Sequence, residues 1–354
     1  MAGEQIVVMG GSYNPPTIAH LRLMQTALDA LNAQKGIFVP VSYAYVKSKM
    51  RKRAGRPVCI PDQLRLDMLA AMCEGDPRLC VSTADMDSPR SVTYQLMRQL
   101  QEAHPDARLH FLIGADKLDL VRGWAAQTDF LNRFGLVVFA RGGVDPNAQI
   151  SEDEALRASR DAFTFAVEPE GIADISSTAV RERMLNGQTC EALMHPGAWV
   201  IFKHLSADDF PPEIERFQGG YAFLSNDYPA PLLLNGVTYS CATSALLAAQ
   251  CANESDRAAI AACGVEKAKK HARQCPTRAD WEHIRLTIAE DILRAKFSQH
   301  PELAEQLKAT GQAVLMDGGH RKDLFWGWDL YTCQGENQLG EALMRIRAEL
   351  QKEI

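Results

Sequence analysis

The sequence predicts two fold classes in succession, a doubly wound parallel α/β sheet and then a mostly helical α+β fold. Short apolar runs alternate with helix-period segments in the N-terminal part, which is typical of parallel sheets. After Pro211–Pro212 these strands stop and amphipathic helices follow. The length of 354 residues also exceeds the ~250–300 residues that one hydrophobic core normally holds. We therefore expect one domain over residues 1–206, a polar linker over 207–214 and a second domain over 215–354.

The elements of the first domain follow from the spacing of their apolar residues. Three segments carry apolar side chains every three or four positions and are predicted as helices: Thr17–Leu31, Pro61–Met72 and Thr93–Leu100. Short apolar runs between turn residues are predicted as buried strands: Ile6–Met9, Gly36–Pro40, Leu79–Val81, Leu109–Ile113, Leu136–Ala140 and Phe163–Val167. In a sheet of this kind, ligands bind beyond the carboxyl ends of the strands.

Composition excludes several classes of protein. A hydrophobic content of 46% with 23% charged residues is that of a globular protein, and a net charge of -6 gives no reason to expect nucleic-acid binding. No apolar run reaches the ~18 residues of a membrane helix, and the N-terminus lacks a signal-peptide layout. The nine cysteines form no C-x-x-C pair and no Cys/His cluster at zinc spacing, so we expect free thiols in a reducing cytoplasm. Four of them recur every 10 to 12 residues and are interpreted as core-facing or incidental: Cys241, Cys251, Cys263 and Cys275.

The first candidate site lies between the first strand and the first helix. Residues 9–20 read Met-Gly-Gly-Ser-Tyr-Asn-Pro-Pro-Thr-Ile-Ala-His. Gly10 and Gly11 have no side chains, so a ligand can approach the backbone closely. The free N–H groups at the helix start favour a phosphate, and Thr17 and His20 share one face of the first turn. Because such turns are common in α/β proteins, a phosphate site here depends on a second motif.

Further candidates follow the ends of other strands. Residues 47–56 hold six basic side chains in ten and are interpreted mainly as a solvated loop, with Lys47 nearest to a phosphate at the strand end. Three more candidates stand just past strand ends: Gly114, Asp116 and Arg141. Trp124 is equally compatible with core packing and with stacking on a ring. Since these positions share one edge of the predicted sheet, we expect them to surround one ligand site.

The second motif is Ile-Ser-Ser-Thr-Ala-Val-Arg at residues 175–181. Its serines and threonine are good N-caps, and Asn186–Gly187 is a helix-end signal, so a helix is predicted between them. Arg181 stands on the same helix face as Thr178, where its guanidinium can fork onto phosphate oxygens. Alone, this pattern indicates a well-capped helix. Together with the first motif, it predicts a second phosphate-binding helix start.

The two motifs together resemble the signatures of the nucleotidylyltransferase superfamily, and most closely those of nicotinamide or nicotinate mononucleotide adenylyltransferases. The resemblance covers about residues 5–206 and includes Gly114-Ala115-Asp116 and Trp124. It implies a Rossmann-like fold and transfer of the adenylyl group from ATP to the mononucleotide, giving NAD or deamido-NAD and pyrophosphate. Many bacterial members carry two histidines in the first motif; here Thr17 stands in the first place, as in eukaryotic-type members. Bacterial members also tend to read Ser-Tyr-Thr where this chain has Ser91-Val92-Thr93.

The resemblance also assigns roles to residues. It implies that His20 donates to the α-phosphate and that Arg181 holds the β- and γ-phosphates, both as catalytic residues. The expected ATP and phosphate contacts are Gly10, Gly11, Ser12, Tyr13, Thr17, His20, Lys47, Ser176, Ser177, Thr178 and Arg181. The expected mononucleotide contacts are Asn14, Thr93, Gly114, Asp116, Trp124 and Arg141. Mg²⁺ is expected on the triphosphate, held mainly by phosphate oxygens, with Asp116 able to bind one of its waters.

The second domain resembles the NADAR family, whose known relatives are N-glycosidases acting on riboflavin precursors or ADP-ribosylated guanine. The matching fragments are Phe217–Asn226, Arg278–Trp281, Ala295–Phe297, Asp323–Gly327 and Gly335–Gly340. Thr243, Ser244 and Gln250 stand where relatives have Glu, His and Lys, and neither Thr nor Gln can stabilise or capture an oxocarbenium-like centre. We therefore expect this domain to bind an NAD or ADP-ribose-like nucleotide without hydrolysing it. The candidate pocket residues are Asn226, Asp323, Trp326 and Asn337.

Several alternatives stay open. The chain could combine adenylyl transfer with N-glycosidase activity, or it could be a regulatory NAD- or ADP-ribose-binding protein with a vestigial transferase half. A sister transferase acting on pantetheine phosphate or choline phosphate would share the phosphate motifs. Intact His20 and Arg181 favour the transferase, whereas the residues at 243 and 250 speak against hydrolysis. The sequence does not separate the nicotinamide from the nicotinate substrate, and it leaves a homo-oligomer open.

Overall fold

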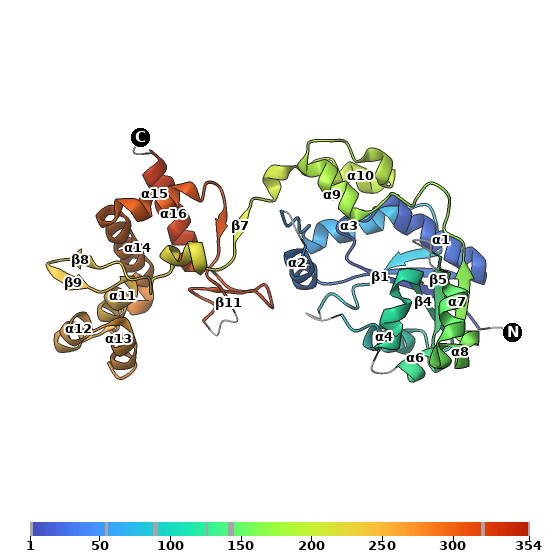
Figure 1. The fold of residues 1–354 in the computed structure, drawn as a ribbon, viewed down its shortest axis with the longest axis horizontal. Helices are drawn as coiled ribbons and strands as arrows, with labels where there is room; N and C mark the ends of the chain where they lie inside the picture. The colour runs from blue at the N-terminus through green and yellow to red at the C-terminus, as the bar shows by residue number, and fades with distance from the viewer. Residues whose placement is uncertain are drawn as a thin grey trace. The chain divides into compact units, whose positions relative to one another are not determined.

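The computed structural model describes residues 3–53, 56–87, 91–124, 127–140, 145–319 and 323–352. The chain divides into two compact units, Met1–Phe210 and Pro211–Ile354, which can be followed by colour in Figure 1. Each cluster of buried apolar side chains in the described residues is drawn from one unit alone, so each unit has a hydrophobic core of its own. In the described part of the chain, no helix has the length and apolar character needed to span a membrane.

The N-terminal unit is built on a six-stranded parallel sheet with the strand order β3-β2-β1-β4-β5-β6. Its strands are β1 (Gln5–Gly11), β2 (Lys35–Pro40), β3 (Leu79–Val81), β4 (Arg108–Gly114), β5 (Gly135–Phe139) and β6 (Phe163–Ala166). Because β1 pairs with β2 on one side and with β4 on the other, the strand order reverses its direction at β1. Ligands of doubly wound sheets bind at such a reversal, beyond the carboxyl ends of the strands. The predicted parallel α/β fold is confirmed.

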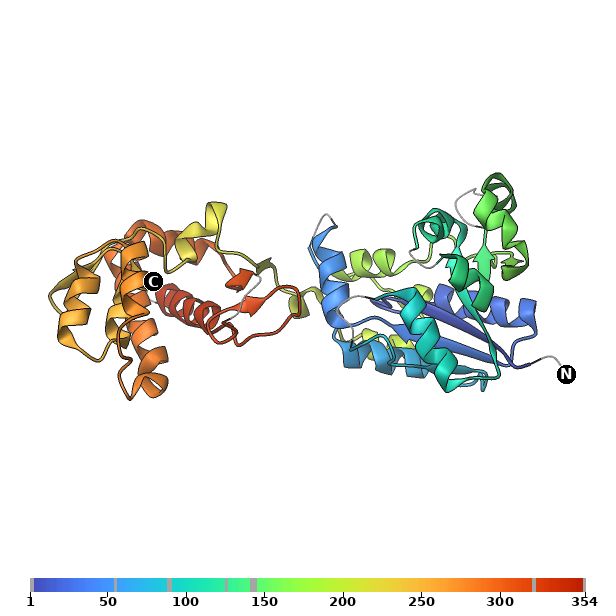
Figure 2. The ribbon, with the colours of Figure 1, turned by 90° about the horizontal axis from the view of Figure 1, so that it is seen from below.

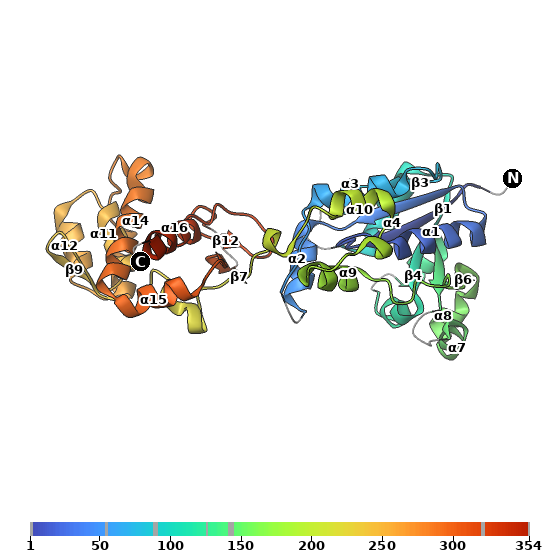
Figure 3. The same cartoon turned by 90° about the horizontal axis from the view of Figure 1, so that it is seen from above.

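Helices cover both faces of this sheet (Figure 2 and Figure 3). The helices of this unit are α1 (Ile18–Leu31), α2 (Tyr43–Arg51), α3 (Asp62–Cys73), α4 (Thr93–Ala103), α5 (Leu118–Arg122), α6 (Gln127–Arg133), α7 (Pro146–Glu152), α8 (Glu154–Ala158), α9 (Ser177–Leu185) and α10 (Pro196–Phe202). Successive residues of β1 point to opposite faces: Val7 packs with residues of α1 and α3, whereas Val8 packs with residues of α4 and α6. Both faces of the sheet are therefore buried, as a parallel sheet requires.

One segment differs from its sequence prediction. The basic stretch that begins at residue 47, expected as a loop, belongs to helix α2 as far as Arg51. Ser42 caps this helix, because its hydroxyl accepts a hydrogen bond from the N–H of Tyr45 at 3.3 Å. The loop prediction was wrong because basic residues surround the few apolar residues of this helix and obscure their helical spacing. The buried apolar residues are Val46 and Met50.

The C-terminal unit is a mostly helical α+β fold, as predicted. Its helices are α11 (Ala242–Gln250), α12 (Glu254–Ala261), α13 (Val265–Ala272), α14 (Trp281–Gln299), α15 (Pro301–Ala309) and α16 (Gln338–Lys352). Its short strands pair in twos: β7 (Glu213–Ile214) with β10 (Val314–Leu315), β8 (Leu232–Leu234) with β9 (Val237–Tyr239), and β11 (Gly318–Gly319) with β12 (Trp328–Asp329). The core joins three helices through Leu293 of α14, Leu307 of α15 and Leu343 of α16.

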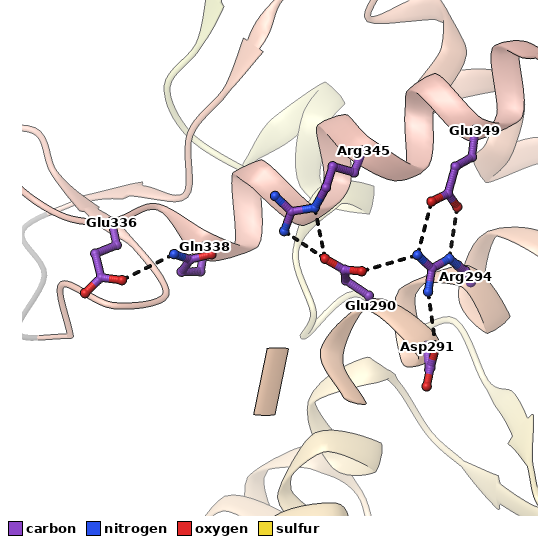
Figure 4. Close-up of polar contacts among 7 residues, drawn as sticks. All are labelled: Glu290, Asp291, Arg294, Glu336, Gln338, Arg345 and Glu349. Atoms are coloured by element: carbon purple, nitrogen blue, oxygen red, sulfur yellow. Dashed lines mark hydrogen bonds and ion pairs between the residues drawn. The ribbon is translucent and has the colours of Figure 1, made fainter. Parts of the chain in front are cut away.

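Ion pairs lie along the surface of the contact between α14 and α16 (Figure 4). Arg294 of α14 forks onto the carboxylate of Glu349 in α16, with N–O distances of 2.9 and 3.1 Å. Glu290 accepts from Arg294 at 3.2 Å and from Arg345 at 2.9 Å. Because Arg294 is 42% exposed, each such pair contributes about 0–1 kcal/mol. The buried apolar cluster, rather than these ion pairs, holds the two helices together.

Candidate functional site

A cavity of about 380 Å³ lies at the carboxyl end of β1. Its walls are the loop between β1 and α1, the starts of α1 and α9, part of α2 and Lys117. All of the predicted ATP and phosphate contacts except Lys47 line it, and so does Asn14. The two motifs, far apart in the sequence, therefore meet at one cavity.

His20 lies in the first turn of α1 and lines the cavity. Its Nδ1 accepts a hydrogen bond from the backbone N–H of Thr17 at 3.0 Å and lies 2.8 Å from the Thr17 hydroxyl oxygen. Because Nδ1 accepts the backbone N–H, a neutral ring carries its proton on Nε2. The capping box at the helix start thus fixes the tautomer, and Nε2–H is the donor of His20 toward a ligand.

The loop between β1 and α1 is held by buried polar contacts. The Asn14 carboxamide donates to the carbonyl of Val58 at 2.7 Å and accepts from the N–H of Ile60 at 2.9 Å. Asn14 is a predicted mononucleotide contact, but its side chain is fully buried in this internal pairing. Tyr13 has a positive φ of 42°, uncommon for a residue with a side chain, and its hydroxyl donates to the carbonyl of Met9 at 2.5 Å.

Arg65 of α3 also holds the loop between β1 and α1 in place. This role was not predicted from the sequence. Arg65 is fully buried, pairs with Asp62, and donates to the carbonyls of Ser12 and Val41, each at 2.6 Å. Its guanidinium thus replaces water for two carbonyls that the strand ends leave unpaired. A signal was present in the sequence, since Arg65 lies three residues before the buried Met68, on the apolar face of the helix.

The cavity carries a concentration of positive charge. The cationic side chains that line it are Lys49, Arg53, Lys117 and Arg181. Lys49 donates to the Ser12 hydroxyl at 3.2 Å, while Arg53 and Arg181 donate to the Thr178 hydroxyl at 2.7 and 3.1 Å. Burial lowers the pKa of Lys49, and the other three cations lower it further. No acidic side chain is among the described residues that line the cavity, so it suits a polyanion such as a polyphosphate.

The helix starts complete this anion site. Ser176 caps α9, its hydroxyl accepting from the N–H of Ala179 at 3.1 Å. The Ser177 hydroxyl donates to the carbonyl of Pro15 at 2.7 Å, and Arg181 donates to the carbonyl of Asn14 at 2.7 Å. These bonds tie the second motif to the first. The N-terminal turns of α1 and α9 thus both face the cavity, where their dipoles favour negative charge.

Lys47 has a different place from the one predicted. It is buried, with 5% of its surface exposed, and its ammonium lies 5.9 Å from the centre of the Tyr43 ring. The residues of this stretch that line the cavity are Lys49, Met50 and Arg53. Since Lys49 and Arg53 are four residues apart, one helical face brings both to the ligand site. The sequence did not identify Lys49 and Arg53 because a loop was predicted here. A loop prediction does not show which side chains share one face of a helix.

The other predicted mononucleotide contacts do not line this cavity. They are Thr93, Gly114, Asp116 and Trp124, while Arg141 lies outside the described residues. The half-exposed carboxylate of Asp116 pairs at 2.9 Å with the ammonium of Lys117, which does line the cavity. Trp124 packs edge-on against Phe130, with 4.8 Å between ring centres, beside the core. The structure therefore places Trp124 in core packing, one of its two interpretations.

The four predicted pocket residues of the C-terminal unit are engaged in different ways. They are Asn226, Asp323, Trp326 and Asn337. Asn337 is buried and bridges two backbone segments: its Oδ1 accepts from the N–H of Asp317 at 3.0 Å, and its Nδ2 donates to the carbonyl of Leu315 at 2.8 Å. The Asp323 carboxylate accepts from the N–H of Trp326 at 3.3 Å. The Asn226 Oδ1 is buried and has no hydrogen-bond partner among the described residues.

Comparison with family models divides the chain at the same place as its sequence motifs. Residues 8–183 match the cytidylyltransferase-like family, and residues 215–351 match the NADAR domain. A probable nicotinate-nucleotide adenylyltransferase of Carboxydothermus hydrogenoformans is 30% identical over 186 residues, which are 52% of this chain and 88% of the relative. A protein of the same name from Clostridium botulinum is 25% identical over 182 residues, covering 51% of this chain and 87% of the relative.

Solved structures are similar to parts of the chain. The NMR structure of Escherichia coli YbiA is 30% identical, with a TM-score of 0.38, and the match covers 40% of this chain and 88% of YbiA. The Plasmodium falciparum nicotinic acid mononucleotide adenylyltransferase complexed with APC is 17% identical, with a TM-score of 0.45, covering 58% of this chain and 98% of that structure. From the sequence relationships, the chain belongs over its N-terminal half to the nicotinate-nucleotide adenylyltransferase family of nucleotidyltransferases and carries a NADAR domain after it.

Proposed function

We propose that the N-terminal unit transfers the adenylyl group of ATP to a pyridine mononucleotide, with nicotinate mononucleotide as the preferred acceptor. The observation that carries this proposal is the cavity at the end of β1. There the Nε2–H of His20, four cations and two helix starts meet without an acidic side chain in the described lining. The choice of nicotinate rests on the names of the curated relatives.

The proposed reaction is a single displacement at the α-phosphorus of ATP. An oxygen of the mononucleotide 5′-phosphate bonds to this phosphorus while the bond to the bridging oxygen breaks, and pyrophosphate leaves with the electron pair. His20 donates from Nε2 to an oxygen of the α-phosphate as charge develops there. Lys49, Arg53 and Arg181 hold the β- and γ-phosphates. The protein thus supplies position and charge rather than a covalent intermediate.

Mg²⁺ fits this proposal as part of the substrate. It would arrive on the triphosphate, where it neutralises charge on the leaving pyrophosphate. The cavity lining is cationic, so the protein offers this ion few ligands of its own. Asp116 is a candidate, because its carboxylate pairs with Lys117, a residue of the cavity lining, and can bind one of the metal's waters.

A direct assay tests the proposal. Purified protein is incubated with ATP and Mg²⁺ and with either nicotinate or nicotinamide mononucleotide, and both pyrophosphate and dinucleotide are measured. We expect the nicotinate substrate to give the higher kcat/KM. His20→Ala should lower kcat by about 10²–10⁴-fold with a smaller effect on KM. The hydrogen bond from His20 stabilises mainly the transition state, in which negative charge develops on the α-phosphate. Undiminished turnover in this variant would contradict the role of His20, and no dinucleotide with either acceptor would contradict the function.

For the C-terminal unit we propose binding of an NAD or ADP-ribose-like nucleotide without hydrolysis. The support is the NADAR match together with the buried Oδ1 of Asn226, which has no hydrogen-bond partner in the described part of the chain. The loop that bears it is fixed by Lys296, whose ammonium donates to the carbonyls of Phe223 at 2.6 Å and Ser225 at 2.9 Å. Thr243, which replaces the family's glutamate, donates to Asp227 at 2.6 Å.

Calorimetry with the full-length chain tests this second proposal. We expect ADP-ribose to bind, and Asn226→Ala to weaken binding about tenfold or more, because one directed hydrogen bond is lost. Chromatography of the mixture should show intact ADP-ribose after prolonged incubation. Released ribose phosphate or free base would favour the bifunctional alternative, and absence of any binding heat with ADP-ribose and NAD would contradict the proposal.

A further inference from the structure

Three side chains that can bind a metal ion meet in the C-terminal unit, where α11, α12 and α13 come together, and a fourth, Cys251, lies nearby. Cys251 ends α11, Asp256 lies in the first turn of α12, His271 lies in the last turn of α13, and Cys275 follows that helix. The ligand atoms of Asp256, His271 and Cys275 all lie within 4.8 Å of one another. The Nε2 of His271 is 3.3 Å from Oδ1 of Asp256.

The surroundings hold these groups in place. The Cys275 thiol donates to the carbonyl of His271 at 3.2 Å, and the Cys251 thiol donates to the carbonyl of Leu247 at 3.3 Å, which ties each thiol to its own segment. Asn253 donates to the second oxygen of Asp256 at 3.0 Å, which leaves Oδ1 turned toward His271. Arg257 donates to the carbonyl of Cys251 at 2.9 Å and brings a positive charge near the Cys251 thiol.

We propose that Asp256, His271 and Cys275 bind Zn²⁺ through one carboxylate, one imidazole and one thiolate, and that the neighbouring Cys251 thiol turns from the carbonyl of Leu247 to supply a second thiolate as the fourth ligand. Four ligands from Cys, His and Asp are what a tetrahedral zinc site uses, and thiolates disfavour hard ions such as Mg²⁺ and Ca²⁺. Three anionic ligands around a divalent ion leave one net negative charge, which Arg257 offsets. The side chains of His271 and Asp256 are 38% and 23% exposed, so the ion has a path from solvent.

The site would have a structural role. The apolar cluster that joins α11, α12 and α13 is small, and its fully buried members are Ala248, Cys251, Ile260 and Ala268. An ion bound by residues from the ends of all three helices would fix an arrangement that this little apolar surface secures weakly. The sequence analysis interpreted these cysteines as core-facing or incidental because the ligands come from three helices. His271 and Cys275 are four residues apart and Cys251 and Asp256 are five apart, but fifteen positions separate Asp256 from His271.

Metal analysis of the full-length chain tests the proposal, with matched cysteine variants. Cys275→Ser and His271→Gln each remove one ligand. Cys263→Ser is the control, because Cys263 is half-buried in the same region but is not among the residues whose ligand atoms lie within 4.8 Å of one another. After incubation with zinc and desalting, we expect about one zinc ion per chain in the wild type and in the control. Competition with a chromophoric chelator should show affinity at least about tenfold weaker in the two ligand variants.

Two further readouts do not depend on catalysis. Co²⁺ in place of zinc should give the charge-transfer absorption of thiolate ligands in the wild type and control, and lose part of it in Cys275→Ser. A chelator should lower the melting temperature of the wild type and control but not of His271→Gln. The inference is overturned if the zinc-treated wild type is metal-free, if Cys275→Ser binds zinc as the wild type does, or if the two thiols are found joined as a disulfide under reducing conditions. Adenylyl transfer should be the same in all variants, so this outcome is separate from the proposed function.

Discussion

Two lysines of α2, two positions apart, test the phosphate site at the scale of single residues. Lys49 lines the cavity and donates to Ser12, whereas Lys47 is buried beside Tyr43. Lys49→Ala removes one cation from the proposed triphosphate site. We expect the KM for ATP to rise about ten- to hundredfold, since a charged hydrogen bond contributes about 1.5–3 kcal/mol. Steady-state kinetics with varied ATP measures this change.

The matched control is Lys47→Met, which keeps a long, flexible side chain in the buried position. Its KM for ATP should stay within about twofold of the wild-type value, because no cavity contact is lost. The reverse pattern, with Lys47→Met impaired and Lys49→Ala normal, would show that the nucleotide phosphates bind elsewhere.

These residues also show how far sequence reasoning reached at the site. Gly10, Thr17, His20 and Arg181 could be named because a strand end or a helix start fixes each of them locally. The sequence could not favour Lys49 over Lys47 as a phosphate contact. That choice depends on which face of the helix each side chain lies on, and this helix has too few apolar residues to show its faces. The partners of the Arg65 and Asn14 side chains come from distant segments, and no local pattern encodes them.

Lys296 gives a prediction for the pH dependence of stability. This lysine of α14 is fully buried, and burial lowers its pKa from 10.5 to about 8. The unfolded chain keeps this proton up to 10.5, so between pH 8 and 10.5 the unfolded state binds more protons than the folded state. Stability therefore rises with pH across this window, and the cost of the buried charge is fully present below pH 8.

The variant Lys296→Met separates this effect from other alkaline changes. Denaturant titration at about pH 7 and about pH 9.5 gives the free energy of unfolding of both proteins. We expect the wild type to gain about 2 kcal/mol relative to the variant between these two conditions, since each pH unit within the window contributes about 1.4 kcal/mol. A difference that does not change with pH would mean that the carbonyl acceptors at 223 and 225 keep the pKa near its usual value.

At the scale of elements, the contact between α16 and β10 depends on one glycine. A Cβ at Gly340 would lie 2.1 Å from the carbonyl oxygen of Leu315 and 2.4 Å from Nδ2 of Asn337. Both atoms belong to the hydrogen bond that ties Asn337 to β10, so neither can move without breaking it. Gly340→Ala should therefore lower the free energy of unfolding of the C-terminal unit by about 1–3 kcal/mol in a denaturant titration.

Gly220→Ala is the control for this prediction. Gly220 belongs to the 3₁₀ helix η5 (Gly219–Leu224), and a Cβ there would meet no atom within 4 Å. Its substitution should change the free energy of unfolding by no more than about 0.5 kcal/mol. Equal losses in the two variants would mean that α16 can shift away from β10 at little cost.

Helices and their ends were more predictable than short strands in the C-terminal unit. The apolar periodicity of α16 is a local property of the chain, which a sequence pattern can reveal. β7 and β10 are two residues each and pair across about a hundred residues, so no window of sequence contains the pattern. The metal-ligand cluster likewise has no local sequence pattern, because its residues are brought together by the packing of three helices.

At the scale of the whole molecule, the boundary between the units can be placed to the residue. Phe210 packs in a cluster of the N-terminal unit, and Arg56 donates to the carbonyls of Phe210 and of Ala207, the latter at 2.7 Å. β7, which begins at Glu213, pairs with β10 of the C-terminal unit. The N-terminal unit therefore needs the chain as far as Phe210, and no cluster of buried apolar residues in the described chain requires more.

A chain of residues 1–210 should accordingly transfer adenylyl groups with kcat and KM within about twofold of the full-length values, because every cavity-lining residue lies inside it. A chain of residues 1–205 is the informative comparison. It lacks Phe210 and both carbonyl partners of Arg56, so its melting temperature should fall by about 5 °C or more while any folded fraction keeps its activity. Circular dichroism and the dinucleotide assay measure the two effects separately. If residues 1–210 fold with the melting behaviour of the intact N-terminal unit yet make no dinucleotide, the NADAR domain is part of the catalytic machinery rather than an independent nucleotide-binding unit.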